Sequence, residues 1–90
     1  MLEIVRLPVP PGTEGEVAAF LEASPYFGQQ GLLAHRILVG EQDPEIALVL
    51  EWASHDAGRA AITSDIGRTF LAGLQERLAG APQITYYEPR

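Results

Sequence analysis

Four short apolar runs of strand type divide the chain. Leu2–Val9 is rich in β-branched and apolar residues and stops at Pro10-Pro11-Gly12, which cannot continue a hydrogen-bonded ladder. Leu32–Val39 and Ile46–Trp52 are two more such runs, and the turn residues between them are typical of a hairpin. Gln83–Glu88 alternates apolar and polar residues. The pattern therefore predicts four strands.

Helical spacing fills two of the intervals between these strands. Thr13 followed three residues later by Glu16 predicts a capping box, which opens a helix over Glu14–Ala23. The second interval predicts a helix over Asp56–Thr63 and a restart capped by Ser64. The restarted helix carries an apolar stripe at Ile66, Phe70, Leu71, Leu74 and Leu78.

The predicted order is strand, helix, strand, strand, helix, strand, with Tyr26–Gly31 as a loop. This order is that of the ferredoxin-like α+β fold, in which both helices lie on one face of an antiparallel sheet. The length of 90 residues fits one domain, over residues 1–90. No linker, repeat or low-complexity stretch interrupts it.

The strands carry apolar residues of both parities, so both faces of the sheet favour burial. In the first strand, for example, Leu2 and Ile4 alternate with Val5 and Leu7. If the helices cover one face, something else must cover the other, and a second copy related by two-fold symmetry is the commonest solution. We therefore expect a homodimer.

Composition narrows the classes of partner. The formal charge of −6, with 6 basic and 12 acidic residues, disfavours nucleic acid and anionic membrane surfaces. The absence of cysteine excludes disulfides and thiolate chemistry. No basic segment precedes a long apolar one, and no apolar run approaches the roughly 18 residues of a membrane span. We expect a cytoplasmic protein.

Neither a phosphate-binding loop nor a hydrolase motif occurs, and the two histidines share no metal-ligand spacing, so we predict no metal site. His55 stands at a helix start and fits an exposed or capping role. His35 alternates with Leu33 and Ile37 on a strand expected to be buried, and burial keeps an imidazole neutral and able to accept a proton. His35 is therefore the candidate catalytic base, and a hydrogen-bonded core or interface histidine is the alternative.

Trp52 ends its strand on the parity of Ile46, Leu48 and Leu50, where a large ring can wall a pocket or simply plug the core. A cavity between sheet and helices would be lined by further large side chains, including Tyr26. The predicted ligand-binding positions are Trp52, Phe27, Ile62, Phe70 and Tyr86.

Several short motifs resemble the antibiotic biosynthesis monooxygenase family in one common register. They are Pro11-Gly12, Gly31-Leu32-Leu33, Asp43-Pro44, Leu50-Glu51-Trp52-Ala53-Ser54, and Ser64 with Phe70 and Leu71. The resemblance covers nearly the whole chain. It implies a dimeric α/β barrel with a pocket in each subunit and, in some members, cofactor-free oxygenation of quinol-like or polyketide substrates. In such chemistry the protein removes a proton, excludes water and holds the ring system.

The resemblance maps Trp52 onto the family tryptophan and His35 onto a position where many members carry an aromatic residue. Members often have a histidine nine residues beyond the tryptophan, where this chain has Ala61. Haem-degrading relatives use an asparagine, and this chain has none. The leading prediction is a monooxygenase-like protein that binds a small aromatic ligand and needs no cofactor. A non-catalytic ligand-binding or interaction module is the alternative, and an amino-acid-sensing domain is less favoured.

Overall fold

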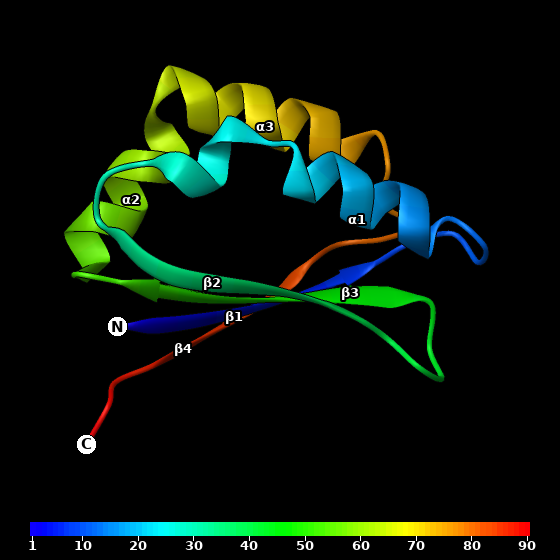
Figure 1. Ribbon diagram of the computed structural model, residues 1–90, viewed down its shortest axis with the longest axis horizontal. Helices are drawn as coiled ribbons and strands as arrows, with labels where there is room; N and C mark the ends of the chain where they lie inside the picture. The colour runs from blue at the N-terminus through cyan, green and yellow to red at the C-terminus, as the bar shows by residue number, and fades with distance from the viewer.

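The computed structural model describes all residues from Met1 to Arg90. Four strands and the helices follow one another in the predicted order, with the second helical segment divided in two (Figure 1). The elements are β1 (Leu2–Pro8), α1 (Glu14–Glu22), the 3-10 helix η1 (Pro25–Gly28), β2 (Leu32–Val39), β3 (Glu45–Trp52), α2 (His55–Thr63), α3 (Asp65–Gln75) and β4 (Gln83–Tyr87).

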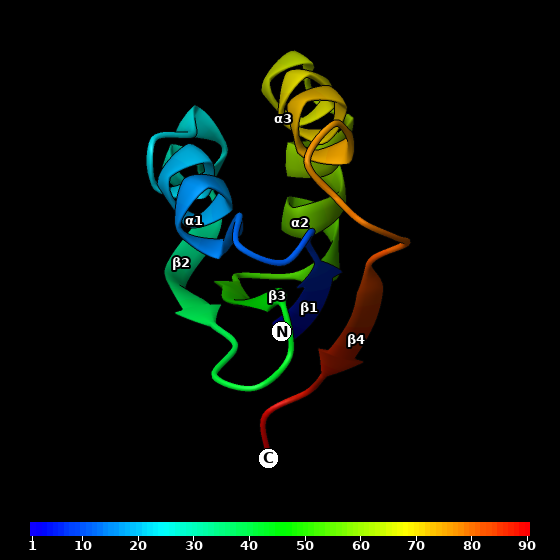
Figure 2. The same ribbon diagram turned by 90° about the vertical axis from the view of Figure 1, so that its right-hand side faces the viewer.

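The strands form one antiparallel sheet in the order β2-β3-β1-β4, so the central pair is β3 and β1. All helices lie on the same side of this sheet, with α1 beside α2 and α3 (Figures 1 and 2). The ferredoxin-like α+β fold predicted from the order of elements is therefore confirmed. None of the helices combines the length and apolarity that crossing a lipid bilayer requires.

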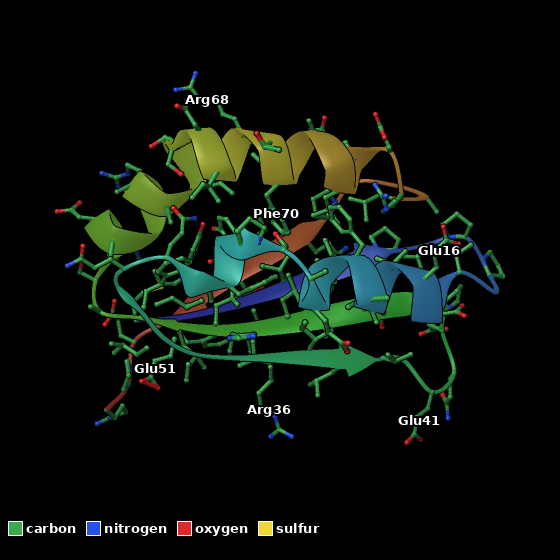
Figure 3. The ribbon with its side chains drawn as sticks, turned by 45° about the horizontal axis from the view of Figure 1, so that its top comes forward. Glu16, Arg36, Glu41, Glu51, Arg68 and Phe70 are labelled. Atoms are coloured by element: carbon green, nitrogen blue, oxygen red, sulfur yellow. The ribbon has the colours of Figure 1, made fainter.

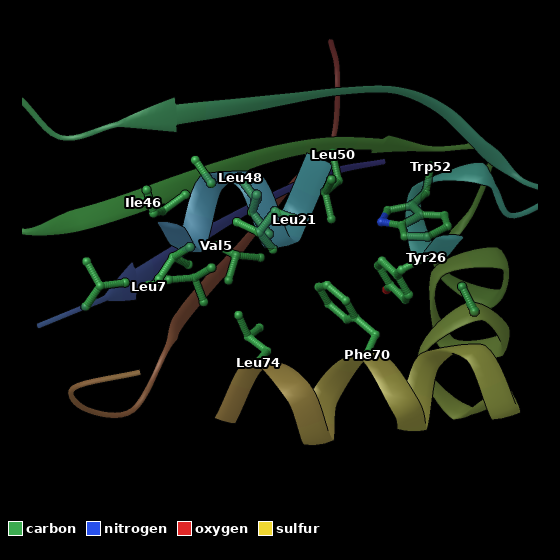
Figure 4. Packing of buried hydrophobic residues seen from close by; sticks show 14 residues of the cluster. Val5, Leu7, Leu21, Tyr26, Ile46, Leu48, Leu50, Trp52, Phe70 and Leu74 are labelled. Atoms are coloured by element: carbon green, nitrogen blue, oxygen red, sulfur yellow. The ribbon is translucent and has the colours of Figure 1, made fainter. Parts of the chain in front are cut away.

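The core forms where the alternation of β3 meets the helices. Ile46, Leu48, Leu50 and Trp52 are all buried, which places every second residue of β3 on the helix side. Side chains of α1 and α3, such as Leu21 and Phe70, complete the layer (Figure 4). Burying each large apolar side chain contributes about 1.5–3 kcal/mol, so this layer supplies the main driving force for folding.

The other face of the sheet has no covering element within the chain. Ile4 pairs with Val49 there, and Leu38 and Tyr87 are exposed on the outer strands. Arg36 and Glu51 point away from the helices on this side (Figure 3). The predicted apolar character of this helix-free face is thus present, interspersed with a few charges.

Three local predictions were wrong. Thr13 does not form the capping box, because its backbone is not in the extended region and its hydroxyl instead donates to the carbonyl of Pro10 at 2.7 Å. The predicted loop after α1 contains η1, whose first turn is fixed by Pro25 and by the Ser24 side chain. Ile66 is exposed, because α3 faces the core with the next residue, Gly67, which is buried.

Candidate functional site

A cavity of about 240 Å³ lies between the helix side of β1 and β4 and the inner surface of α2. Its volume is near the lower end of small-molecule pockets, which suits a small ring system. Four of its eight lining residues are hydrophobic. The lining comprises Met1, Glu3, Tyr26, His55, Gly58, Arg59, Ile62 and Tyr86.

Glu3 lines the cavity, and Trp52 lies directly behind it. Glu3 belongs to the same strand parity as Val5 and Leu7, so β1 directs its carboxylate toward the helices. The fully buried Trp52 donates its indole Nε1–H to Glu3 Oε1 at 2.9 Å. Gly58 of α2 lies against the indole, and a Cβ there would be in van der Waals contact with the ring at 3.5 Å.

Tyr26 brings a phenol into the cavity from η1. Tyr26 is only 4% exposed. Its ring stacks on that of Phe70, with centroids 4.3 Å apart, and meets the Trp52 ring edge-on, with centroids 6.1 Å apart (Figure 4). The hydroxyl makes no hydrogen bond within the chain, and since no buried side-chain polar atom lacks a partner, it is accessible from the cavity that Tyr26 lines. Burial, and then the nearby Glu3 carboxylate, raise the pKa of Tyr26 far above its ordinary value. The hydroxyl is therefore a donor throughout the physiological pH range.

Tyr86 and two residues of α2 form the rim. Tyr86 is the partner of Glu3 in the β1–β4 register, and partial burial, followed by Glu3, raises the pKa of its phenol. Its ring lies 5.7 Å from that of His55, whose Nε2 pairs with Glu88 at 3.0 Å. Arg59 pairs with Asp56 of its own helix at 3.4 Å. The rim charges are thus largely matched, and they lie in solvent.

The predicted site residues separate into two groups. Ile62 and Tyr86 line the cavity, while Trp52 and Phe70 lie behind its aromatic wall. Phe27 packs edge-on against Tyr26 and Phe70, and its other neighbour is His35, with ring centroids 4.9 Å apart.

His35 does not line the cavity. Pairing of His35 with Leu50 and of Leu32 with Trp52 places His35 and Trp52 on the same face of the sheet, as predicted. The expected burial of His35 was wrong: its side chain is exposed, because β2 is an edge strand and only Phe27 packs on the imidazole.

Sequence reasoning missed Glu3 and gave His55 only a surface role. The signal for Glu3 was present, because an acidic residue shares the parity of buried Val5 and Leu7. Nothing in the sequence indicated that the start of α2 would reach β4 and bring His55 to the rim. The helix itself is capped by Ser54, which accepts from the Ala57 N–H at 3.1 Å.

Ala61 occupies the position at which the family resemblance leads one to expect a histidine. It is buried, and its carbonyl accepts hydrogen bonds from Ser64 Oγ at 2.6 Å and from Gln29 Nε2 at 3.3 Å. A methyl side chain cannot exchange a proton, so the acid–base groups of the site must come from elsewhere. No group of three or more side chains is placed to ligate a metal ion.

A second concave surface of about 420 Å³ lies between the end of α1 and α3, and its floor includes Phe20, Ile66 and Phe70. Its only ionisable lining residue is Asp65. Because the cavity beside Glu3 joins aromatic walls to several polar groups, it is the better candidate for chemistry.

Several solved structures share this fold over nearly the whole chain. A monooxygenase from the gene ActVA-Orf6 of Streptomyces coelicolor, solved in complex with nanaomycin D, is 20% identical, with a TM-score of 0.83 over 99% of this chain and 86% of that one. SnoaB, a cofactor-independent oxygenase from Streptomyces nogalater, is 20% identical, with a TM-score of 0.77 over 99% and 93%. A structure named antibiotic biosynthesis monooxygenase is 14% identical, with a TM-score of 0.80 over 100% and 99%.

These identities establish a common fold. Neither a family model nor a curated protein matches the sequence.

Proposed function

We propose that the chain is a cofactor-independent monooxygenase-like protein of the antibiotic biosynthesis monooxygenase type, acting on an aromatic, quinol or polyketide-type small molecule. Two of the structures with the same fold are named as oxygenases, and one of them is in complex with nanaomycin D. The sequence motifs around Trp52 point in the same direction. We propose the cytoplasm as its compartment on composition alone.

The observation that carries the proposal is the Tyr26 hydroxyl, which has no partner within the chain and opens onto a cavity walled by aromatic rings. Such a cavity can hold a flat ring, while the hydroxyl and the Glu3 carboxylate supply directional polar contacts. Oxygenation of an electron-rich ring needs little more from the protein, because the substrate anion itself reduces dioxygen. One oxygen atom enters the product and the other leaves as water.

The sequence and the structure favour different residues as the base that forms this anion. His35 is the sequence-based proposal, and it stacks on Phe27 at the edge of the same aromatic cluster. A ligand large enough to extend from the cavity past Phe27 would reach it. We therefore retain His35 as a proposed base and include it in the test.

Oxygen consumption tests the function directly. Purified protein is mixed with a panel of hydroquinones and anthrones, and uptake is followed with an oxygen electrode against a no-protein blank. The expected result is turnover of at least one small member, reduced by about 10²-fold or more in a variant that lacks the base. His35→Ala tests the sequence-based candidate for this base, and Glu41→Ala, in the exposed turn after β2, is the control (Figure 3). No uptake above the blank with any member would overturn the oxygenase proposal.

A non-catalytic ligand-binding module is the second candidate. The observation in its favour is Ala61, a buried residue without an acid–base group at the position where the resemblance leads one to expect a histidine. Saturable binding of an aromatic ligand without any oxygen uptake would support this alternative.

We also propose that the helix-free face pairs with a second copy of the chain. Ile4, Val49 and Leu38 give it an apolar centre that no element of this chain covers. A chain of 90 residues buries only about 60–65% of its unfolded surface, so added burial at such an interface would contribute to folding.

A further inference from the structure

The contact between Glu3 and Trp52 leaves half of a carboxylate facing the cavity. Oε1 of Glu3 accepts from the indole N–H at 2.9 Å, and Oε2 makes no hydrogen bond within the chain. Because the indole is fully buried and packed against Gly58, it holds the carboxylate in one orientation. An ionised carboxylate is purely an acceptor, so its free oxygen calls for a donor from the ligand.

The Tyr26 hydroxyl supplies the complementary group. It comes from η1, it makes no hydrogen bond within the chain, and, because no buried side-chain polar atom lacks a partner, it is accessible from the cavity. The stacking of its ring on Phe70 at 4.3 Å fixes the direction of the phenol. A ligand between them would meet an acceptor and a donor at once.

We infer that Glu3 receives the acidic hydrogen of the ligand, that Tyr26 donates to the ligand's oxygen, and that the cavity therefore selects neutral hydroxyaromatic or aryl-ketone ligands over carboxylated ones. The catalytic half of this inference rests on the proposed function, and the binding half does not. Trp52 acts as a positioning residue for Glu3.

The two histidines are less suited to the role. His35 lies outside the cavity on the exposed edge strand. His55 is at the rim, is half exposed, and already pairs with Glu88 at 3.0 Å. Glu3 alone combines a place in the lining, a fixed orientation and an unused acceptor.

The phenols remain donors under the same conditions. Burial and the neighbouring carboxylate both raise the pKa of Tyr26, and the same two causes raise that of Tyr86. A deprotonated phenol beside Glu3 would place two negative charges together, so the protonated form is favoured. The arrangement thus provides an oxyanion-stabilising donor opposite the acceptor.

Charge accounts for the selectivity. Glu3 has no cationic partner, because the Met1 ammonium, which also lines the cavity, donates to the Trp52 carbonyl at 3.0 Å and Arg59 at the rim pairs with Asp56. A second carboxylate on the ligand would meet repulsion in a partly dehydrated cavity. A neutral ligand with one ionisable hydrogen avoids this penalty.

The reaction balances without any other cofactor. In anthrone, a proton leaves the methylene carbon for Glu3, and the carbanion, delocalised onto the ketone oxygen near Tyr26, transfers electrons to dioxygen. A carbon–oxygen bond forms at the former methylene, and the second hydrogen and the proton held by Glu3 leave with the other oxygen atom as water. Anthrone and dioxygen thus give anthraquinone and water, with dioxygen as the four-electron acceptor.

Calorimetric titration tests the binding half with three stable probes: 2-naphthol, 2-methoxynaphthalene and 6-hydroxy-2-naphthoate. The wild type should bind 2-naphthol about tenfold more tightly than either of the others, as expected for one hydrogen bond to a charged acceptor and for one like-charge contact. In Glu3→Gln the amide oxygen can still accept from Trp52. This variant should lose the preference for 2-naphthol over 6-hydroxy-2-naphthoate. Glu16→Gln, on the exposed surface of α1, is the matched control. Equal affinities for all three probes in the wild type would overturn the inference.

Oxygen uptake with anthrone tests the catalytic half. Glu3→Gln should lower kcat by about 10²- to 10⁴-fold while leaving 2-naphthol affinity within tenfold, and Tyr26→Phe should lower kcat by a smaller factor. Circular dichroism melting shows whether each variant is folded. If Glu3→Gln is folded and turns over at the wild-type rate, Glu3 is not the proton acceptor. If the wild type takes up no oxygen but shows the charge-dependent binding, the proposed function fails and the ligand selectivity attributed to Glu3 stands.

Discussion

Replacement of Gly67 by alanine should destabilise the protein through a backbone collision at the junction of α2 and α3. A Cβ at Gly67 would lie 2.2 Å from the carbonyl oxygen of Ala61, 2.5 Å from that of Ile62 and 2.6 Å from the Ile62 carbonyl carbon. These are backbone atoms, which no side-chain rotation can remove. The first turn of α3 must therefore move away from α2, which strains the hydrogen bond from the Gly67 N–H to Ser64 Oγ.

The expected magnitude follows from three opposing contributions. Forced overpacking costs about 1–3 kcal/mol, and weakening of an N-cap adds about 1 kcal/mol. Alanine favours the helix over glycine by about 1 kcal/mol, which offsets one of these. The net loss is about 1–3 kcal/mol, which for a domain of this size lowers Tm by roughly 5–20 °C.

Urea denaturation followed by far-UV circular dichroism measures this loss. Gly15→Ala is the matched control, because Gly15 lies within α1 and a Cβ there meets nothing within 4 Å. The control should gain about 0.5–1 kcal/mol from helix propensity. A Gly67→Ala variant as stable as the wild type would show that the close approach of the two helices does not constrain the fold. Since α2 carries Ile62, the variant should also bind 2-naphthol more weakly.

Three further outcomes follow from the same structure. Ile4→Glu should convert a dimer to a monomer of lowered stability in sedimentation experiments, because it places a charge on the helix-free face; an unchanged dimer would contradict the proposed interface. Trp52→Phe should lose about 2–4 kcal/mol in urea unfolding, from the cavity left by the indole and the loss of its bond to Glu3. Because the pKa of Tyr26 is raised above its ordinary value of 10, the stability it contributes is complete below that pH and is lost as pH rises further, so Tyr26→Phe should flatten the alkaline decline between about pH 10 and 12 in thermal melts.

The fold could be predicted from the sequence because its determinants are local. The alternation from Ile46 to Trp52 specifies which face of β3 is buried, and the turn residues before it specify the hairpin. The capping residue Ser64 predicts the break between α2 and α3, and its side chain accepts from the Gly67 N–H at 3.0 Å. Each of these signals involves neighbours in the chain, so no knowledge of long-range packing was needed.

The candidate site depended on contacts that the sequence does not encode locally. The parity of His35 correctly indicated its face of the sheet, but the place of β2 at the edge left it exposed. Glu3 and Trp52 are 49 positions apart, and only the pairing of β1 with β3 brings the carboxylate to the indole. Periodicity determines which way a side chain points; what it meets there is decided by strand order and helix placement, because those arise from packing of the whole chain.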